Sequence, residues 1–395
     1  MLLGLLLARA GVQVLVLEKH ADFLRDFRGD TVHPSTLEIM AELGLLEEFL
    51  RRPHQQLRQL SGRIAGEVLH LADFSHLPAP ARFIALMPQW EFLDFLAEQA
   101  RRYPSFELRM QAEVVGLLWN RGEVSGVRVQ TPEGMLEVQS DLLVGADGRS
   151  SLVREQAGLS VRDLGAPIDV LWMQVSRRPS DGTQLFGYVE SGHVLVLLDR
   201  GDYWQCAFVI PKGQFESLQA EPIRSLHRQI VAIAPFLSDR MAELTSWQEV
   251  KLLSVRVDRL RQWCRPGLLC IGDAAHAMSP VGGVGINLAI QDAVAAANLL
   301  VGQLRQGAPA LDELRRVQRR RELPTRLVQS AQLAVQNRFL GPALGGTASV
   351  PALARLLNRF PVLRRVPARL IGLGVRREHV SAAIARPAES TATAR

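Results

Sequence analysis

Residues 268–300 constrain this chain more than any other part of its 395 residues. An apolar strand, residues 268–271, leads into Gly272-Asp273 and then a loop of small residues that holds Pro280, Gly282, Gly283 and Gly285. An amphipathic helix is predicted to begin near Ile286-Asn287. A strand, an acid, a glycine loop and a helix start in this order present free backbone N–H groups and a carboxylate to one ligand. The pattern predicts a site for a large, flat and partly anionic cofactor.

A second acid stands at the end of another buried strand. Residues 142–144 run into Gly145-Ala146-Asp147-Gly148, and Arg149 and Arg154 follow. On its own, Asp-Gly indicates only a turn. Because it is the second aspartate at a strand end in this chain, we expect Asp147 and Gly148 to contact the same cofactor as Asp273.

A third acid, Glu18, ends the apolar strand 12–17 and is followed by Lys19. In dinucleotide-binding βαβ units an acid about 20 residues beyond a glycine fingerprint binds the ribose hydroxyls. Counting back from Glu18 places that fingerprint at or before residue 1, where only Gly4 and Gly11 are found. We therefore expect the first strand and phosphate loop to be missing. Either the start lies roughly 15–20 residues too late, which we favour because residues 1–10 keep a helical pattern, or the product is an inactive fragment.

Glu18, residues 28–31, Gln89, residues 145–154 and residues 272–287 together resemble the FAD-dependent aromatic hydroxylases, the para-hydroxybenzoate hydroxylase-like flavoprotein monooxygenases. The resemblance covers about residues 1–330. It implies that Glu18 binds the adenosine ribose, that Arg28 and Gln89 lie against the diphosphate and ribityl chain, and that Asp273 binds the ribityl chain. Asp147 would serve FAD and the NAD(P)H path, and N–H groups near Gly285 would face the flavin pyrimidine. The full expected cofactor set is Glu18, Lys19, Arg28, Gln89, Val114, Asp147, Gly148, Gly272, Asp273, Pro280, Gly282, Gly283, Gly285, Ile286 and Asn287.

The resemblance also implies an activity. Such an enzyme uses NAD(P)H and O₂ to hydroxylate an aromatic or similar apolar substrate through a flavin C4a-hydroperoxide. The sequence identifies no substrate base and no metal site. A flavin-dependent halogenase or a prenyl-chain reductase on the same scaffold is an alternative, as is the inactive fragment. Residues 203–212 resemble the Trp-rich stretch of halogenases, but Phe208 stands where a second Trp is expected.

The predicted fold is α/β: an FAD-binding Rossmann-like domain interrupted by an antiparallel β-sheet substrate domain, with a helical C-terminus. We expect residues 1–58, 86–165 and 256–330 in the first domain, and 59–85 and 166–255 in the second. Residues 331–395 would be helical with a disordered end. Ser35 to Glu38 reads as a capping box that opens a helix over 36–50, and helix breaks are expected at Pro324, Pro351, Pro361 and Pro367. The sheet-domain aromatics that could line a substrate pocket are Trp172, Phe186, Tyr188, Tyr203, Trp204 and Phe208, about half of them as simple core.

The charge is uneven. Residues 301–395 hold 17 Arg against 5 Asp and Glu, a balance of +12, so residues 1–300 carry −6 of the formal +6. We interpret these arginines as a solvated face of the C-terminal helices. The alternative interpretation is a peripheral surface that binds anionic lipid. No recognition motif supports nucleic-acid binding. The three cysteines form no CxxC pair and are typical of reduced residues in a cytoplasmic protein.

Overall fold

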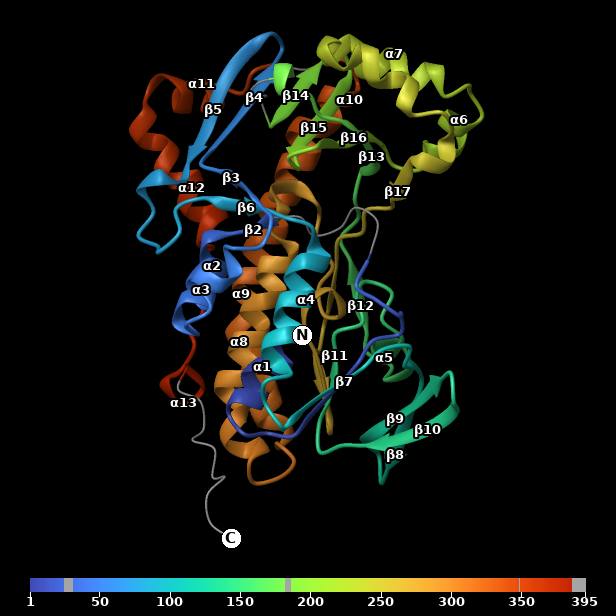
Figure 1. Cartoon of the computed structure of the whole chain (residues 1–395), viewed down its shortest axis with the longest axis vertical. Coiled ribbons are helices and arrows are strands. Elements are labelled where there is room, and N and C mark those ends of the chain that lie inside the picture. The colour runs from blue at the N-terminus through green and yellow to red at the C-terminus, as the bar shows by residue number, and fades with distance from the viewer. Residues whose placement is uncertain (25–30, 182–185, 348, 386–395) are drawn as a thin grey trace.

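The computed structural model describes residues 1–24, 31–181, 186–347 and 349–385. Figure 1 shows two long helices, α8 (Gly285–Leu304) and α9 (Leu311–Val335), running through the molecule beneath a large, mostly antiparallel sheet. Val281–Leu304 is long and apolar enough to cross a membrane, but 67 % of its most apolar window is buried, as in the core helix of a domain. The mixed α/β class and the helical C-terminus are as predicted.

Two pairs of parallel strands form the core beside these helices. β1 (Val14–Leu17) follows α1 (Leu2–Arg9) and pairs with β7 (Phe106–Arg109), whereas β11 (Leu143–Gly145) pairs with β20 (Leu268–Cys270). Among the described residues the two pairs belong to separate sheets. All of β1 and two of the three residues of β11 are only half-buried, although strands of a parallel sheet are usually covered on both faces. The core therefore holds two separate parallel pairs in place of one continuous parallel sheet.

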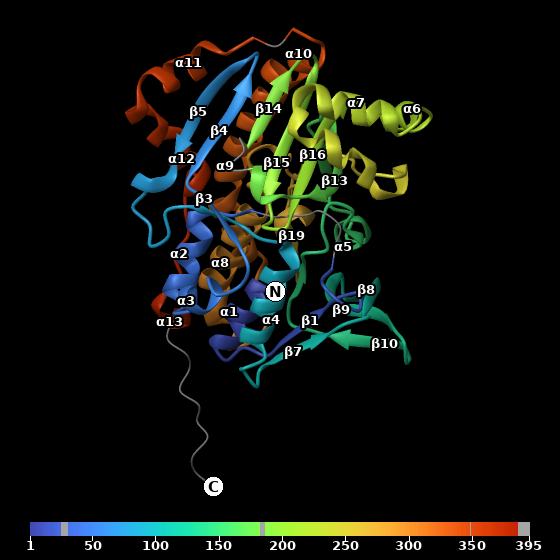
Figure 2. The ribbon, with the colours of Figure 1, turned by 45° about the horizontal axis from the view of Figure 1, so that its top comes forward.

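The large sheet has seven strands in the order β17-β13-β16-β15-β14-β4-β5. Their bounds are Lys251–Leu253, Ile168–Ser176, Tyr203–Pro211, His193–Asp199, Gly187–Glu190, Gln59–Ile64 and Glu67–Asp73. One face packs on α7 (Arg224–Ile233) and on the 3₁₀-helix η3 (Pro235–Glu243), as Figure 2 shows for α7. The opposite face turns toward α10 (Gly341–Leu344) and the rest of the chain. The sheet therefore has an outer face, covered by its own helices, and an inner face.

Smaller elements complete the fold. The strands are β2 (Thr31–Val32), β3 (Gln55–Leu57), β6 (Ile84–Leu86), β8 (Glu113–Asn120), β9 (Glu123–Thr131), β10 (Gly134–Gln139), β12 (Val161–Asp163), β18 (Asp258–Leu260) and β19 (Cys264–Arg265). The helices are α2 (Pro34–Glu42), α3 (Leu46–Phe49), α4 (Gln89–Ala100), α5 (Leu152–Gln156), α6 (Phe215–Gln219), α11 (Ala352–Arg359), α12 (Arg365–Gly372) and α13 (Ala382–Ala385). α11 and α12 pack on β5 at one edge of the large sheet (Figure 2).

Three predictions about helices are wrong. The capping box does not form, because helix α2 already begins at Pro34, with His33 as its N-cap, and Ser35 lies inside it. The expected helix over 36–50 is also split after Glu42, where Gly44 takes a left-handed φ of 73°. Pro324 does not break α9, which continues through it from Leu311 to Val335. Burial of this helix against α8 holds it together although the proline removes one backbone hydrogen bond.

The last described helix returns to the first. Arg9 of α1 donates from Nε to the carbonyl of Ile384 (3.3 Å) and from Nη2 to that of Ala385 (2.7 Å). These carbonyls lie at the end of α13, where cations satisfy unpaired backbone acceptors. The beginning of the chain is therefore fastened to residues that follow it by more than 370 positions.

Candidate functional site

The two loops with aspartates leave the same edge of the core. In the β11–β20 pair Gly145 lies opposite Cys270, so the strands end side by side and Asp147 and Asp273 follow them. The Arg149 guanidinium reaches across, with Nη2 3.6 Å from Asp273 Oδ2. The structure thus brings together the two segments that the sequence singled out.

Arg154 holds these two loops in place. Its guanidinium donates to the carbonyls of Arg149 (2.6 Å) and Ala274 (3.4 Å), one from each loop. It also forms a two-pronged ion pair with Asp258, with both N···O distances at 3.1 Å. Both side chains are buried. Removing one partner of a buried ion pair strongly destabilises the fold, because the other charge is left buried without a partner.

Asp147 has a structural task within its own loop. Its Oδ1 accepts from Ser151 Oγ (2.5 Å) and its Oδ2 accepts from the backbone N–H of Val153 (3.1 Å). The carboxylate therefore caps the first turn of α5. Gly148 has a φ of 85°, which favours glycine at that position. The cofactor contact expected of both residues stays a prediction.

The glycine loop before α8 leaves donors open. The first three residues of α8 are Gly285, Ile286 and Asn287. Their backbone N–H groups have no hydrogen-bond acceptor among the described residues. Unpaired N–H groups and the positive end of the helix dipole attract oxygen acceptors of a ligand. Asp273, Pro280 and Gly282 remain partly exposed along the same loop. This is the chemistry that the pyrimidine edge of a flavin requires, so these residues fit FAD.

Asn287 is buried, and its side chain holds the glycine loop in place through four hydrogen bonds. Its Oδ1 accepts from the backbone N–H of His33 and from Thr36 Oγ1, both at 2.8 Å. Its Nδ2 donates to the carbonyls of Thr31 (3.0 Å) and Gly283 (3.2 Å). Every hydrogen-bonding position of this amide serves the frame, so only the backbone N–H of Asn287 is left for a cofactor.

The remaining predicted cofactor contacts are Glu18, Lys19, Arg28, Gln89 and Val114. Glu18 follows β1, and its carbonyl accepts from the N–H of Ala112 (2.9 Å), which brings Val114 of β8 to the same end of the core. Glu18 is half-buried and Lys19 is exposed. Gln89 is the first residue of α4 and is half-buried. Arg28 lies outside the described residues.

Sequence reasoning missed a row of glutamines on α9 and at the start of the π-helix η7 (Gln336–Leu340) that follows it. Gln329 donates to the carbonyls of Asp258 and Ala277, Gln332 to those of Ser279 and Val281, and Gln336 to Ser279 Oγ at 2.6 Å. These residues recur at intervals of three and four, which places them on one helix face. That spacing was the available signal. The row supports the backbone that leads from Asp258 to the glycine loop.

A buried network of charges also holds the site. Asp292 of α8 accepts from His276 (2.5 Å), from Arg321 Nε (3.0 Å) and from the N–H of Gly272 (3.1 Å). Arg321 also contacts Glu378 at 3.2 Å. Burial by itself would raise the pKa of Asp292, but His276 and Arg321 outweigh it and lower that pKa. His276 is therefore held inside the buried network by Asp292.

His33 is a buried histidine beside the same loop. Its Nδ1 lies 2.8 Å from the Ile371 carbonyl, so this nitrogen carries the proton in the neutral ring. The other ring nitrogen, Nε2, is buried without a partner in the described part of the chain. Burial lowers the pKa of His33 to about 4, although the Ile371 carbonyl acts in the opposite direction.

The aromatics of the large sheet separate by face. Tyr188, Trp204 and Phe208 belong to the apolar cluster under α7 and η3 on the outer face. Trp172 and Phe186 pack against clusters of the inner face. Trp172 Nε1 is a buried donor with no acceptor among the described residues. In the same part of the chain, no group of three or more His, Cys, Asp and Glu side chains is arranged to hold a metal ion.

Comparison with known proteins assigns the family. A family model described as FAD binding domain matches residues 1–331. The chain belongs to this FAD-binding family. It is 32 % identical to 6-methylpretetramide 4-monooxygenase of Streptomyces rimosus over 93 % of this chain and 88 % of that protein. It is 30 % identical to a rifampicin monooxygenase of Streptomyces venezuelae over 72 % of this chain, which spans only 58 % of that relative.

Solved structures of flavoproteins share the fold of this FAD-binding chain. p-Nitrophenol 4-monooxygenase PnpA of Pseudomonas putida superposes with a TM-score of 0.77 over 95 % of this chain and 96 % of that one, at 20 % identity. PqsL of Pseudomonas aeruginosa, a probable FAD-dependent monooxygenase, gives a TM-score of 0.72. The predicted family and fold class, a para-hydroxybenzoate hydroxylase-like FAD-binding fold with an antiparallel sheet, are confirmed.

Proposed function

We propose that this FAD-binding chain is a monooxygenase that hydroxylates an aromatic substrate with NAD(P)H and O₂ as co-substrates. The observation that carries the proposal is the group of three open N–H donors at the start of α8, beside the loop of Asp273. The similarity to 6-methylpretetramide 4-monooxygenase over 93 % of the chain supports an aromatic substrate of that kind.

The residues of the chain hold and shield the cofactor. FAD, when bound, supplies the redox chemistry and the activation of O₂. Asp273 would accept a hydrogen bond from a hydroxyl of the ribityl chain, and Glu18 would accept one from the adenosine ribose. The N–H groups of Gly285 and Ile286 would donate to the pyrimidine oxygens. The apolar inner face of the sheet would keep water from the reacting ring.

We assign the substrate side of the site to Trp172. The indole and Val281, which belongs to the glycine loop, pack against the same apolar cluster, so sheet and loop come together there. A buried donor without an acceptor costs roughly 1–3 kcal/mol, and a substrate oxygen would satisfy Trp172 Nε1. Tyr188, Trp204 and Phe208 belong to the outer-face core and are left out of this assignment.

The open edges of β1 and β11 suggest how the site is completed. We propose that a strand encoded upstream of Met1 joins the two parallel pairs and supplies the phosphate loop. Burial lowers the pKa of the Met1 amino group, while the charge of Glu18 raises it. Glu18 and the first residue therefore lie near each other, where that loop would lead into α1.

The test compares the 395-residue chain with a version extended by the in-frame upstream codons. We expect the purified protein to show a flavin spectrum, and to consume NAD(P)H and O₂ in proportion when an aromatic substrate is supplied. Asp273→Ala should bind FAD about tenfold less tightly or worse, because a charged hydrogen bond contributes about 1.5–3 kcal/mol. Asp312→Ala, which removes an exposed carboxylate, is the matched control. Undiminished FAD in Asp273→Ala would refute the assignment.

Two further results would favour the alternatives. Turnover that requires chloride or bromide would identify a halogenase, and reduction of a prenyl chain without O₂ would identify a reductase. Absence of flavin from both the 395-residue and the extended proteins would favour an inactive fragment. We also propose a cytoplasmic location, supported by the three buried, unpaired cysteines.

A second proposal concerns the outer surface of α11 and α12, here named the C-terminal apolar surface. It consists of Leu353, Leu356, Phe360, Val362, Val366 and Leu370, each 43–67 % exposed. Residues 352–377 hold seven arginines and no acid. Exposed aliphatic side chains within a wholly cationic segment complement an anionic bilayer. We propose that this surface rests on anionic lipid.

A further inference from the structure

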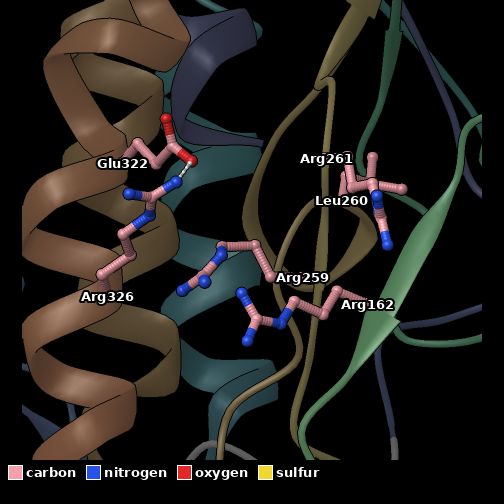
Figure 3. A pocket seen from close by; sticks show the side chains of 6 residues that line it. All are labelled: Arg162, Arg259, Leu260, Arg261, Glu322 and Arg326. Carbon is pink, nitrogen blue, oxygen red and sulfur yellow. Dashed lines mark hydrogen bonds and ion pairs between the residues drawn. The ribbon is translucent and has the colours of Figure 1, made fainter.

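An arginine-lined cavity lies between the strands β12 and β18 and the helix α9, outside the residues assigned to the cofactor. It encloses about 400 Å³ and is lined by Arg162, Arg259, Leu260, Arg261, Glu322 and Arg326. Four arginines and one glutamate are among the lining residues, so the formal charge of the lining is +3. Figure 3 shows the Arg162 and Arg259 side chains extending from their strands toward α9, which carries Arg326 and Glu322.

The pairing of two strands places two of these arginines opposite each other. In the antiparallel pair β12–β18, Arg162 lies directly opposite Arg259. Like charges at directly opposed positions of an antiparallel pair are destabilising. A cross-strand pair of arginines is therefore unfavourable unless an anion joins them.

The protein itself does not neutralise this pair. The next residues along the strands are acids, but Asp258 is bound by Arg154 and Asp163 accepts from the N–H of Gly165. Glu322 pairs with Arg326 at 2.5 Å. In the described part of the chain, no carboxylate forms an ion pair with Arg162, Arg259 or Arg261.

Arg259 is the fixed member of the group. Its residue is only 8 % exposed, and Nη1 donates to Gln329 Oε1 at 3.0 Å, which orients the guanidinium from α9. Burial lowers the pKa of Arg259, and the charges of Arg326 and Arg162 lower it further against the effect of Glu322. An oriented, poorly hydrated guanidinium is the group that proteins use to bind phosphate oxygens in pairs.

We propose that this cavity binds a phosphate-bearing ligand, a diphosphate or a phosphate ester, between Arg162, Arg259 and Arg326. A polyanion of two or three charges matches the local excess of +3, and the cavity is larger than one phosphate group requires. The ligand is either a free anion or the phosphate portion of a dinucleotide. The lining residues are separate from those assigned to the cofactor, so the site can be tested separately from the proposed activity.

The direct test is calorimetric titration of the chain with pyrophosphate at constant ionic strength, set with sodium chloride. We expect saturable one-to-one binding. Arg162→Gln and Arg326→Gln should each weaken it by about tenfold or more, since hydrogen bonds to charged groups contribute roughly 1.5–3 kcal/mol. Arg128→Gln removes an equal charge from an exposed pair with Glu137 and should change binding less than twofold. Arg162 is exposed, so its variant should fold even where Arg259→Gln does not.

Competition separates the two ligand sources. If NADPH or NADH displaces pyrophosphate, and Arg162→Gln raises the KM for that dinucleotide at unchanged kcat and flavin content, the site holds dinucleotide phosphates. Pyrophosphate that binds equally well beside either dinucleotide would identify a separate anion site. A chain that shows no saturable pyrophosphate binding, or an equal loss in Arg128→Gln, would overturn the proposal.

Discussion

The imidazole of His33 couples the stability of the fold to pH. Its pKa is about 4 in the folded chain and near 6.5 when unfolded, so the unfolded state binds more protons below pH 6.5. The stabilising contribution is complete above pH 6.5 and is lost as the pH falls toward 4. We expect the wild type to lose up to about 3 kcal/mol from this group, and His33→Gln to lose correspondingly less.

Urea unfolding at pH 7, 5.5 and 4 measures this difference. His20→Gln removes an exposed histidine and should follow the wild type. Buried carboxylates such as Asp292 also weaken the fold in acid, so the difference between variant and wild type is the quantity to compare. Parallel pH profiles for wild type and His33→Gln would contradict the prediction.

Gly283 should not tolerate a side chain. It has a φ of 62°, and a Cβ placed on it would lie 2.4 Å from Thr31 Oγ1, whose hydroxyl donates to the Gly283 carbonyl at 2.8 Å. Gly283→Ala is expected to cost about 1–3 kcal/mol in strain and to weaken FAD binding by displacing the loop. Gly302→Ala, in open space on α8, should be neutral or slightly stabilising. Thermal unfolding and flavin fluorescence titration report both effects, and equal behaviour of the two variants would count against this role.

At this scale the sequence indicated which residues form the loop but not what each side chain does. The glycines and Asp273 were predictable because turn chemistry and strand ends are local signals. The side chain of Asn287 was not, since its four partners come from positions about 250 residues earlier and from the loop itself. Asp147 likewise serves its own helix, a role that an Asp-Gly pair does not distinguish from ligand binding.

Among the elements, α9 acts as a support for the glycine loop through its row of glutamines. Gln332 accepts from the N–H of Ser279 and donates to the carbonyls of Ser279 and Val281. Gln332→Met keeps the volume but leaves three backbone groups unsatisfied, at about 1 kcal/mol or more for each. We expect a loss of about 3 kcal/mol or more and faster amide exchange at Ser279. The exposed Gln219→Met on α6 is the control, and unchanged exchange at Ser279 in Gln332→Met would exclude the support.

Strands are easier to predict from the sequence than helix ends. The segments 169–175, 193–198 and 204–210 are rich in apolar residues, because the strands that they form are covered by helices on one face and by the rest of the chain on the other. Residues 61–71 show strand-like alternation, and they lie in the hairpin of β4 and β5, which turns at Ala65 and Gly66. Pro324 and the false capping box show the opposite case, in which burial against other elements overrides a local signal.

For the whole molecule, the C-terminal apolar surface should give the chain an affinity for anionic vesicles. We expect co-sedimentation with phosphatidylserine-containing vesicles, little with phosphatidylcholine alone, and a decrease with added salt. Leu353→Ser combined with Val366→Ser should weaken binding at least about tenfold, because each buried aliphatic side chain contributes about 1.5 kcal/mol or more. The matched control is Val115→Ser combined with Met135→Ser, because both residues are exposed on the small sheet of β8, β9 and β10.

Two outcomes would overturn the lipid proposal. Equal binding to neutral and anionic vesicles would remove the electrostatic argument. Concentration-dependent dimers in sedimentation velocity, abolished by the Leu353 and Val366 changes, would assign the surface to a second copy of the chain.

The sequence predicted an incomplete parallel sheet, and the structure has two separate parallel pairs in the place of one sheet. The counting argument from Glu18 rests on the length of a βαβ unit, which its geometry sets, and the missing strand stays a prediction. The network of Asp292, Arg321 and Glu378 was beyond such counting, because it joins segments separated by 29 and 57 positions with no periodic signal between them.

The bonds that Arg9 and Arg321 make near the end of the chain have a consequence for its boundaries. The family match stops at residue 331, yet Arg9 is held by Ile384 and Ala385, and Arg321 by Glu378. A protein cut at the end of the family match would leave both arginines without these acceptors, one of them deep in the interior. The stretch that is shared with relatives and the stretch that folds cooperatively are therefore different in extent.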